Sequence, residues 1–502
     1  MKHIVTKMLA VVLFASAFIY VACDKKVLNI PPPTQSEASF FTSESEFRTA
    51  IIGAYARLND YYSSANPGSG GSAELQVWFM PGDDLSVNGG EVFEIFSGLN
   101  PSTGKLNQFF TSSYVMIARA NKIIQKIAEK ADIYTTPNLR NNNEGEMLFL
   151  RAFGHFMLWN VFGTAPVDTI VVTSTSQFGL PSSSGTELLD QSIADLTRAA
   201  ALLPDSWDAA NIGRVTKNAA YALLGKCLVF KASANKSASD YQAAISAFNQ
   251  IAGVALLPNF GDNFEVTTEN NAESLFEFQA GRNISGFQNS WLSNEECDCG
   301  VAGSYFQMFY GGASTYMGGG RYVPTNKLKG IFETGDPRLP FTMSDDQTQI
   351  IKYIVNGDAV DNNTSLNNHR VIRYADVLLL KAEAVVKSNG STAEAIGLIN
   401  QVRTRARNMV GGGTVPADLN TAETNETIIM QWIMDERLRE LAAEGHRWFD
   451  IRRWSLAGYI TLDNAYFSSV RSDMGFKPFN IYFPIPDGET SRNANIIQND
   501  GY

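Results

Sequence analysis

The sequence predicts a mostly α-helical fold in which paired helices form a scaffold with long irregular loops and a small α+β lobe. Three observations predict it: apolar residues recur at helical spacing, one two-helix unit is repeated, and two long stretches lack any helical period. The 502-residue chain is therefore expected to alternate between regular helical segments and irregular connections that are rich in glycine and aromatic residues.

The clearest helical period lies between residues 186 and 203. Its apolar positions, spaced i, i+4, i+7 and i+11, are Leu189, Ile193, Leu196 and Ala200. Ser184 and Glu187 have the spacing of a capping box at the start of this helix, and Pro204 ends it. The stretch is therefore predicted to be an amphipathic helix with one buried face.

The same unit, two helices joined through a connection, is expected three times along the chain. The predicted pairs are residues 145–161 with 186–203, residues 213–233 with 239–248, and residues 374–387 with 391–402. Ser239 with Gln242, and Ser391 with Glu394, have capping-box spacing at the second helix of two pairs. Alanines at the crossing positions let paired helices approach closely, which predicts a scaffold of tetratricopeptide-like helix pairs.

Two stretches, residues 61–103 and 260–368, are rich in Gly, Asn, Ser and aromatic residues and show no helical period. Connections of this length inside a compact domain usually carry function or small elements of their own. We expect a signal peptide over residues 1–22, an extended tether over 23–36 and one domain over 37–502. Within that domain, the scaffold is assigned to residues 37–60, 105–255 and 370–456, the loop-rich lobe to 61–104 and 256–369, and a C-terminal segment to 457–502.

The N-terminus has the order of a secretory signal. Lys2 and Lys7 precede an apolar run from Met8 to Ala22, which is followed by Cys23. The run is about 15 residues long and therefore too short to span a bilayer, which takes roughly 20. A small residue before the cysteine is typical of bacterial lipoprotein signals, although Tyr20 stands where Leu is usual. We expect lipidation at Cys23, with an ordinary cleaved signal as the alternative.

The composition argues against several classes of function. The net charge of −11 disfavours nucleic-acid binding. Outside the signal, His155, His369 and His446 do not have the spacing of a metal site, and no phosphate-binding or nucleophile motif is present. We therefore expect no metal, no cofactor and no catalytic residue. Cys297 and Cys299 stand in a polar stretch with no further metal ligand near in sequence, and their role stays open.

The C-terminal part carries a specific pattern of charged and aromatic residues. It reads Ile433-x-x-Glu436-Arg437-x-x-Glu440-Leu441-x-x-Glu444-Gly445-x-Arg447-Trp448-x-Asp450-Ile451-x-Arg453-Trp454. This run closely resembles the C-terminal signature of the SusD/RagB family. The resemblance extends over most of the chain through Phe40-Phe41, Gly53-Ala54-Tyr55, Arg119-Ala120-Asn121, Arg151-Ala152-Phe153, the stretches 373–384 and 399–406, and Pro484-Ile485-Pro486.

The resemblance implies a function as well as a fold. Members of this family have tetratricopeptide-like helix pairs, sit on the outer surface of Bacteroidetes-type bacteria and form a lid over a SusC-like TonB-dependent transporter. They capture oligosaccharides or, in the RagB branch, peptides, and they catalyse nothing. The aromatic-rich loops favour an oligosaccharide ligand here. Peptide binding on the same scaffold and a hydrolase hidden in the loops are the alternatives.

A protein that binds sugars needs exposed aromatic rings beside side chains that form hydrogen bonds with hydroxyl groups. The candidate ligand contacts in the two loop stretches are Trp78, Asp83, Asp84, Asn88, Trp291, Tyr305, Tyr310, Tyr316, Arg321 and Tyr322. Five glycines between residues 311 and 320 surround Tyr316, so its ring is expected to be easy to approach. For Trp78, which has apolar neighbours, a place in the core is an equal alternative.

Glu436, Glu440 and Glu444 share one face of a predicted helix, at i, i+4 and i+8. Two nearby carboxylates can serve as the acid and base of a glycosidase. Three arginines lie within a turn or two and can keep the carboxylates ionised; they are Arg437, Arg439 and Arg447. We therefore expect a buried structural clamp that includes Glu436, Arg437, Glu440 and Arg447, rather than a catalytic site.

Overall fold

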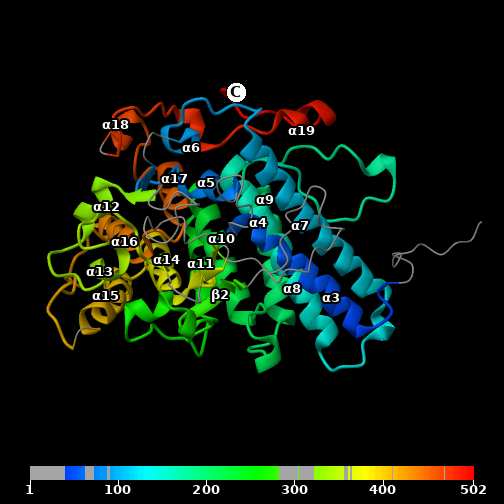
Figure 1. The fold of residues 1–502 in the computed structure, drawn as a ribbon, viewed down its shortest axis with the longest axis horizontal. Coiled ribbons are helices and arrows are strands. Elements are labelled where there is room, and N and C mark those ends of the chain that lie inside the picture. The colour runs from blue at the N-terminus through cyan, green and yellow to red at the C-terminus, as the bar shows by residue number, and fades with distance from the viewer. Residues whose placement is uncertain are drawn as a thin grey trace, which may run out of the picture.

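Long helices make up most of the molecule, together with short two-stranded ribbons (Figure 1). The computed structural model describes residues 40–62, 73–87, 91–281, 304, 322–354, 360–361, 364–409, 411–468 and 470–502. The principal helices are α3 (Glu44–Tyr55), α7 (Gly104–Glu129), α8 (Leu139–Phe162), α9 (Glu187–Leu202), α10 (Lys217–Asn235), α11 (Ala238–Phe248), α14 (Tyr374–Lys387), α15 (Thr392–Asn408), α16 (Glu426–Leu441) and α17 (Arg447–Ala457). The mostly helical fold predicted from the sequence is confirmed.

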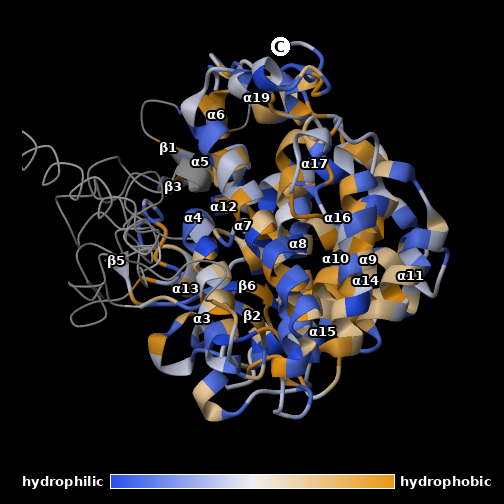
Figure 2. Cartoon of the chain, turned by 90° about the vertical axis from the view of Figure 1, so that its right-hand side faces the viewer, coloured by the Kyte–Doolittle hydropathy of each residue, from blue (hydrophilic) through white to orange (hydrophobic). Residues whose placement is uncertain are grey.

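The predicted helix pairs are present, since α8 packs on α9, α10 on α11 and α14 on α15. These pairs also contact one another, because α10 lies against both α9 and α14 (Figure 2). Small residues allow the close approach within a pair: a Cβ atom at Gly225 of α10 would overlap the ring of Phe248 on α11. The stack of pairs thus buries one continuous apolar core.

The helix caps differ in detail from those predicted. Ser391 caps α15 as expected, and its Oγ accepts the Glu394 N–H at 3.3 Å. At α11 the cap is Ser237 instead of Ser239, and its Oγ accepts the Asp240 N–H at 3.2 Å. A capping serine must stand directly before the first helical residue, and the sequence offered two serines within reach of that position.

Short elements occupy the described parts of the loop-rich stretches and of the C-terminal segment. The short helices are α4 (Asn59–Tyr62), α5 (Ala73–Phe79), α6 (Val92–Ile95), α12 (Asn326–Ile331), α13 (Leu339–Thr342), α18 (Asn464–Phe467) and α19 (Asp487–Arg492). The antiparallel ribbons pair β1 (Leu85–Val87) with β3 (Tyr322–Pro324), β2 (Ser274–Phe278) with β6 (His369–Arg373), and β4 (Val360–Asp361) with β5 (Thr364–Ser365). β1 and β3 thereby join two stretches that are far apart in the sequence.

The C-terminal segment runs along one edge of the scaffold, where α18 and α19 lie near α6 at the top of Figure 1. A tight connection between α16 and α17 contains Ala443 at φ +58° and Gly445 at φ +82°. This connection leads directly into α17, which carries the last charged residues of the C-terminal pattern. Among the described residues, no helix combines the length and the apolar character that a membrane crossing requires.

Candidate functional site

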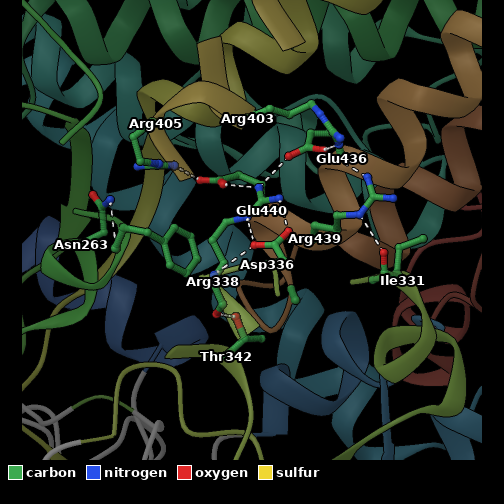
Figure 3. A network of polar contacts seen from close by, with 12 residues as sticks. Asn263, Ile331, Asp336, Arg338, Thr342, Arg403, Arg405, Glu436, Arg439 and Glu440 are labelled. Atoms are coloured by element: carbon green, nitrogen blue, oxygen red, sulfur yellow. Dashed lines mark hydrogen bonds and ion pairs between the residues drawn. The ribbon is translucent and has the colours of Figure 1, made fainter. Parts of the chain in front are cut away.

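A network of buried charges joins α16 to segments that precede it in the chain (Figure 3). Glu436 and Glu440 stand one turn apart on α16, and Arg338 reaches both of them. Arg338 Nη1 lies 2.6 Å from Glu436 Oε1 and 3.0 Å from Glu440 Oε2. Arg338 Nη2 also lies 2.7 Å from Asp336 Oδ2. Because a guanidinium carries five N–H donors in a planar fork, one arginine can hold all three carboxylates.

Each of the two glutamates has further arginine partners. Arg403 Nη1 lies 2.9 Å from Glu436 Oε2, and Arg373 Nη1 lies 2.6 Å from Glu440 Oε1. Arg405 pairs with Glu440 as well. These arginines come from α15 and from the end of β6, so the network ties α16 to both elements.

Glu444 extends the network beyond the end of α16. Arg373 Nε lies 2.8 Å from Glu444 Oε2, and Lys352 Nζ lies 2.6 Å from Glu444 Oε1. Lys352 Nζ also donates to the carbonyl groups of Glu440 and Ala442, each at 3.0 Å. A cation at this place satisfies carbonyl groups that the end of a helix leaves without partners.

The electrostatics of the network favour ionised glutamates. Burial alone would raise the pKa of Glu444, but attraction by Arg373 and Lys352 outweighs it and lowers that pKa to about 2. The pKa values of Glu436 and Glu440 are lowered in the same way, because arginine attraction exceeds the effect of burial. A general acid needs a proton near neutral pH. The geometry therefore supports a structural role for Glu436, Glu440 and Glu444, and it does not support a pair of catalytic carboxylates as in a glycosidase.

Arg437 is buried and ion-paired, but its partners are aspartates and not the glutamate row. Its Nη1 lies 2.8 Å from Asp376 Oδ1, and its Nε lies 2.8 Å from Asp450 Oδ2. One residue along a helix turns a side chain by about 100°, which directs Arg437 away from the face that carries Glu436. Arg439, three residues after Glu436, does contact it, at 3.1 Å.

Asp83 and Asp84 are buried. Arg447 pairs with Asp83, with Nη2 3.1 Å from Oδ2, and Lys327 Nζ lies 2.6 Å from the same oxygen. Asp84 Oδ2 accepts the Ala443 N–H at 3.1 Å. Burial raises the pKa of Asp84 to about 6. The two carboxylates thus fasten the turn after α5 to the connection between α16 and α17.

Trp78 belongs to the core, where its exposed fraction is 3%. Its ring stacks on that of Phe449, with 6.2 Å between centroids, and meets Tyr62 edge-on at 5.6 Å. Tyr322, on β3, is also fully buried. Buried side chains offer no face to a sugar, so the predicted ligand contacts at four positions are corrected to structural roles; these are Trp78, Asp83, Asp84 and Tyr322.

The other predicted contacts lie outside the described residues and stay predictions. They are Asn88, Trp291, Tyr305, Tyr310, Tyr316 and Arg321. Cys23, the predicted lipidation site, and the pair Cys297 and Cys299 lie outside them as well. In the part of the chain that the structure describes, no group of three or more His, Cys, Asp or Glu side chains is arranged to hold a metal ion.

Two surface grooves were not predicted. One, of about 530 Å³, lies where the first turns of α3 and α8 meet residues 204–214, and Trp207 lines it. The other, of about 790 Å³, runs along α15 and is lined by Tyr374, Gln401 and Asn408 among others. The sequence held one signal for the first groove, a lone tryptophan in a polar connection between two helices.

Two family models match different parts of the chain. A model of the SusD family matches residues 304–502, and a second, described as "Starch-binding associating with outer membrane", matches residues 39–228. SusD-like protein P2 of Formosa agariphila is 25% identical, over 92% of this chain and 94% of that protein.

Solved structures show the same relationship. A SusD superfamily protein from Bacteroides vulgatus is 26% identical and superposes with a TM-score of 0.68, covering 92% of this chain and 100% of that one. A laminarin-binding SusD-like protein is 24% identical, with a TM-score of 0.72 and coverage of 92% and 100%. The matched sequence models, the relatives and the fold agree, and this chain belongs to the SusD/RagB family of non-catalytic binding proteins.

Proposed function

We propose that this chain is a lipid-anchored protein of the outer-membrane surface that captures oligosaccharides and delivers them to a SusC-like TonB-dependent transporter. Family membership along most of the chain is the observation that carries this proposal. One matching model is described as starch-binding, and one structure of the same fold is described as laminarin-binding. Starch and laminarin are uncharged glucans, which favours a neutral oligosaccharide as the ligand.

The buried charge network supports this function by holding the scaffold on which binding loops depend. Arg338, Lys352 and Arg373 lie on described segments that follow residues 305–321, and each pairs with a carboxylate of the C-terminal pattern. Ion pairs buried at both partners resist displacement, because separating them leaves a charge without compensation. Binding residues are most effective when such a rigid framework positions them.

The proposed ligand contacts are the aromatic loop residues, Tyr316 and Trp291 above all. Calorimetric titration of the unlipidated Cys23→Ser variant with maltohexaose, laminarihexaose, mannohexaose and xylohexaose tests the ligand class. Saturable binding of at least one hexasaccharide is expected, and combined replacement of Tyr316 and Trp291 by Ala should weaken it about five- to a hundredfold. Phe178→Ala, which removes a ring that is 66% exposed, is the matched control.

Two outcomes contradict the proposal in different ways. Failure of every hexasaccharide to bind, together with saturable binding of a short uncharged peptide, replaces the oligosaccharide with a peptide ligand. Unchanged saccharide binding by the double loop variant removes Tyr316 and Trp291 from the site. The partner has a separate test: mild detergent extraction of outer membranes should co-purify a SusC-like transporter, and recovery of the chain alone contradicts that part.

A further inference from the structure

The groove around Trp207 lies on the helical scaffold and not in the loop-rich stretches. Its walls come from the first turns of α3 and α8 and from the connection between α9 and α10. The helices α3 and α8 contact each other. Its volume of about 530 Å³ falls within the range of small-molecule sites. Of the residues that the structure describes, neither the charge network of α16 nor Trp78, Asp83, Asp84 and Tyr322 lines this groove.

The ring of Trp207 is held in place on one face and at one edge. Its Nε1 donates to the Val215 carbonyl oxygen at 2.8 Å. The guanidinium carbon of Arg214 lies 4.0 Å from the ring centroid, in a cation–π contact. The indole is half-buried and lines the groove together with Arg214. It is therefore a fixed aromatic surface in the groove wall, with a cation against its ring.

The support behind this platform is itself rigid. Arg214 Nε donates to Oε1 of the buried Glu146 at 2.8 Å. Tyr55 donates to the same oxygen at 2.7 Å, and the hydroxyl of Tyr55 accepts the Val215 N–H at 3.0 Å. A ring fixed in this way loses little conformational entropy when a ligand stacks on it.

Hydrogen-bonding groups line the groove beside the ring. Asn142 and Arg48 both line the groove. Within the described part of the chain, their side chains make no hydrogen bond. Asp208 uses Oδ1 to accept from Ala210 N–H and from the Asn211 amide. Amide, guanidinium and carboxylate groups together can both donate to and accept from sugar hydroxyls.

The balance of charge in the groove favours a neutral ligand. Two arginines, Arg48 and Arg214, and two carboxylates, Glu44 and Asp208, line it. Glu44 is already occupied, because it accepts the N–H groups of two threonines, at 2.6 and 2.7 Å. A lining of balanced charge gives no advantage to a strongly anionic or cationic ligand.

We propose that this groove is a saccharide-binding subsite, in which Trp207 stacks on a pyranose ring and Asn142 and Arg48 hydrogen-bond to hydroxyl groups of a neutral oligosaccharide. This inference rests on the proposed function and adds a second contact region for the same ligand class. The residues of the subsite belong to α3, α8 and the connection after α9, so they can be replaced separately from Tyr316 and Trp291. Two contact regions on one chain increase the apparent affinity for a long polymer beyond that of either alone.

Calorimetry on the full chain with the same four hexasaccharides tests the subsite. Trp207→Ala should lower the affinity about tenfold or remove one binding event per chain, and Trp207→Phe should retain most of the binding. Asn142→Ala should weaken binding several-fold. This variant removes no hydrogen bond from the described structure, so it remains informative if Trp207→Ala unfolds. Phe178→Ala is again the control for loss of an exposed ring.

Unchanged affinity and stoichiometry in Asn142→Ala and in any folded Trp207→Ala overturn the subsite. The proposed function survives that result if the unaltered chain binds a hexasaccharide and the double loop variant does not. Failure of the unaltered chain to bind any of the four overturns the proposed function and the subsite together. A longer polymer gives a further readout: electrophoretic retardation in gels containing starch or laminarin should be weaker for Trp207→Ala than for Phe178→Ala.

Discussion

Arg338 Nη1 lies 2.6 Å from Glu436 Oε1, although the two residues are 98 positions apart in the sequence and both side chains are fully buried. The pair joins the segment before α13 to the helix that opens the C-terminal family pattern. It stands at the centre of the network in which arginines from separate segments meet the carboxylates of α16.

Replacement of Arg338 by Ala should destabilise the protein by about 3 kcal/mol or more, because Asp336, Glu436 and Glu440 would lose a buried cation. Urea unfolding followed by circular dichroism measures the loss. Arg198→Ala is the control, since that arginine side chain is 63% exposed and its ion pair should contribute less than about 1 kcal/mol. Equal midpoints for the two variants contradict the structural role of the network.

Gly445→Ala should destabilise more strongly than a glycine replacement elsewhere with a similar backbone angle. Gly445 has φ +82°, and a Cβ atom there would overlap the ring of Trp78. Gly253 has φ +71° but faces open space. We expect about 1 kcal/mol of backbone strain for Gly253→Ala and on the order of 3 kcal/mol or more for Gly445→Ala. Similar thermal midpoints for the two variants argue against a close contact at Trp78.

The raised pKa of Asp84 predicts a pH-dependent loss of stability. Burial shifts this pKa to about 6 in the folded protein, so the folded chain keeps the proton at pH values where the unfolded chain releases it. The stability from this group is therefore present below about pH 4 and lost as the pH rises through 6.

Asp84→Asn cannot ionise and should lack this loss. As the pH rises from 4 to 8, the free energy of unfolding of Asp84→Asn should increase relative to that of the unaltered protein, by on the order of 2 kcal/mol. Thermal unfolding across this range measures the difference. Asp132→Asn, at an exposed position, is the control for the same substitution outside the core. Parallel curves for Asp84→Asn and the unaltered protein would place Asp84 in contact with water.

Lipidation at Cys23 predicts a mature protein that begins at this residue and carries acyl mass. Mass spectrometry of the N-terminal peptide from the membrane fraction detects the modification. Cys23→Ser should abolish the acyl mass and release the protein from the membrane, while the binding of hexasaccharides in solution stays unchanged. A mature chain that begins elsewhere and is secreted into the medium contradicts the anchor.

The helix pairs could be predicted from the sequence because helical periodicity and capping are local. The predicted range 374–387 coincides with α14. The apolar face of this helix follows from the spacing of apolar residues within the segment itself. The network could not be predicted in the same way. Spacing along a helix shows which residues share a face, but it cannot show that Arg338 and Arg373 approach Glu440 from other segments.

The predicted binding residues illustrate a second limit. Tyr322 follows a glycine-rich stretch and Trp78 has apolar neighbours, yet both are buried. The aromatic content of a loop does not reveal which rings pack inward, since this depends on partners such as Phe449 that are distant in the sequence. The groove residue Trp207 could not be predicted for a different reason. A single aromatic residue among polar residues forms no recognisable sequence pattern, and the groove arises only where α3 and α8 come together beside it.

The direction of synthesis gives the charge network a consequence for the order of folding. The arginines at positions 338, 373, 403 and 405 are made before the glutamates at 436, 440 and 444 that neutralise them. A partly made chain that closed this region early would enclose four guanidinium groups with Glu273, Glu333 and Asp336 as their carboxylate partners, which leaves an excess of buried positive charge. The network is therefore complete only once α16 and Glu444 have been made, so its full closure is expected to come late in folding.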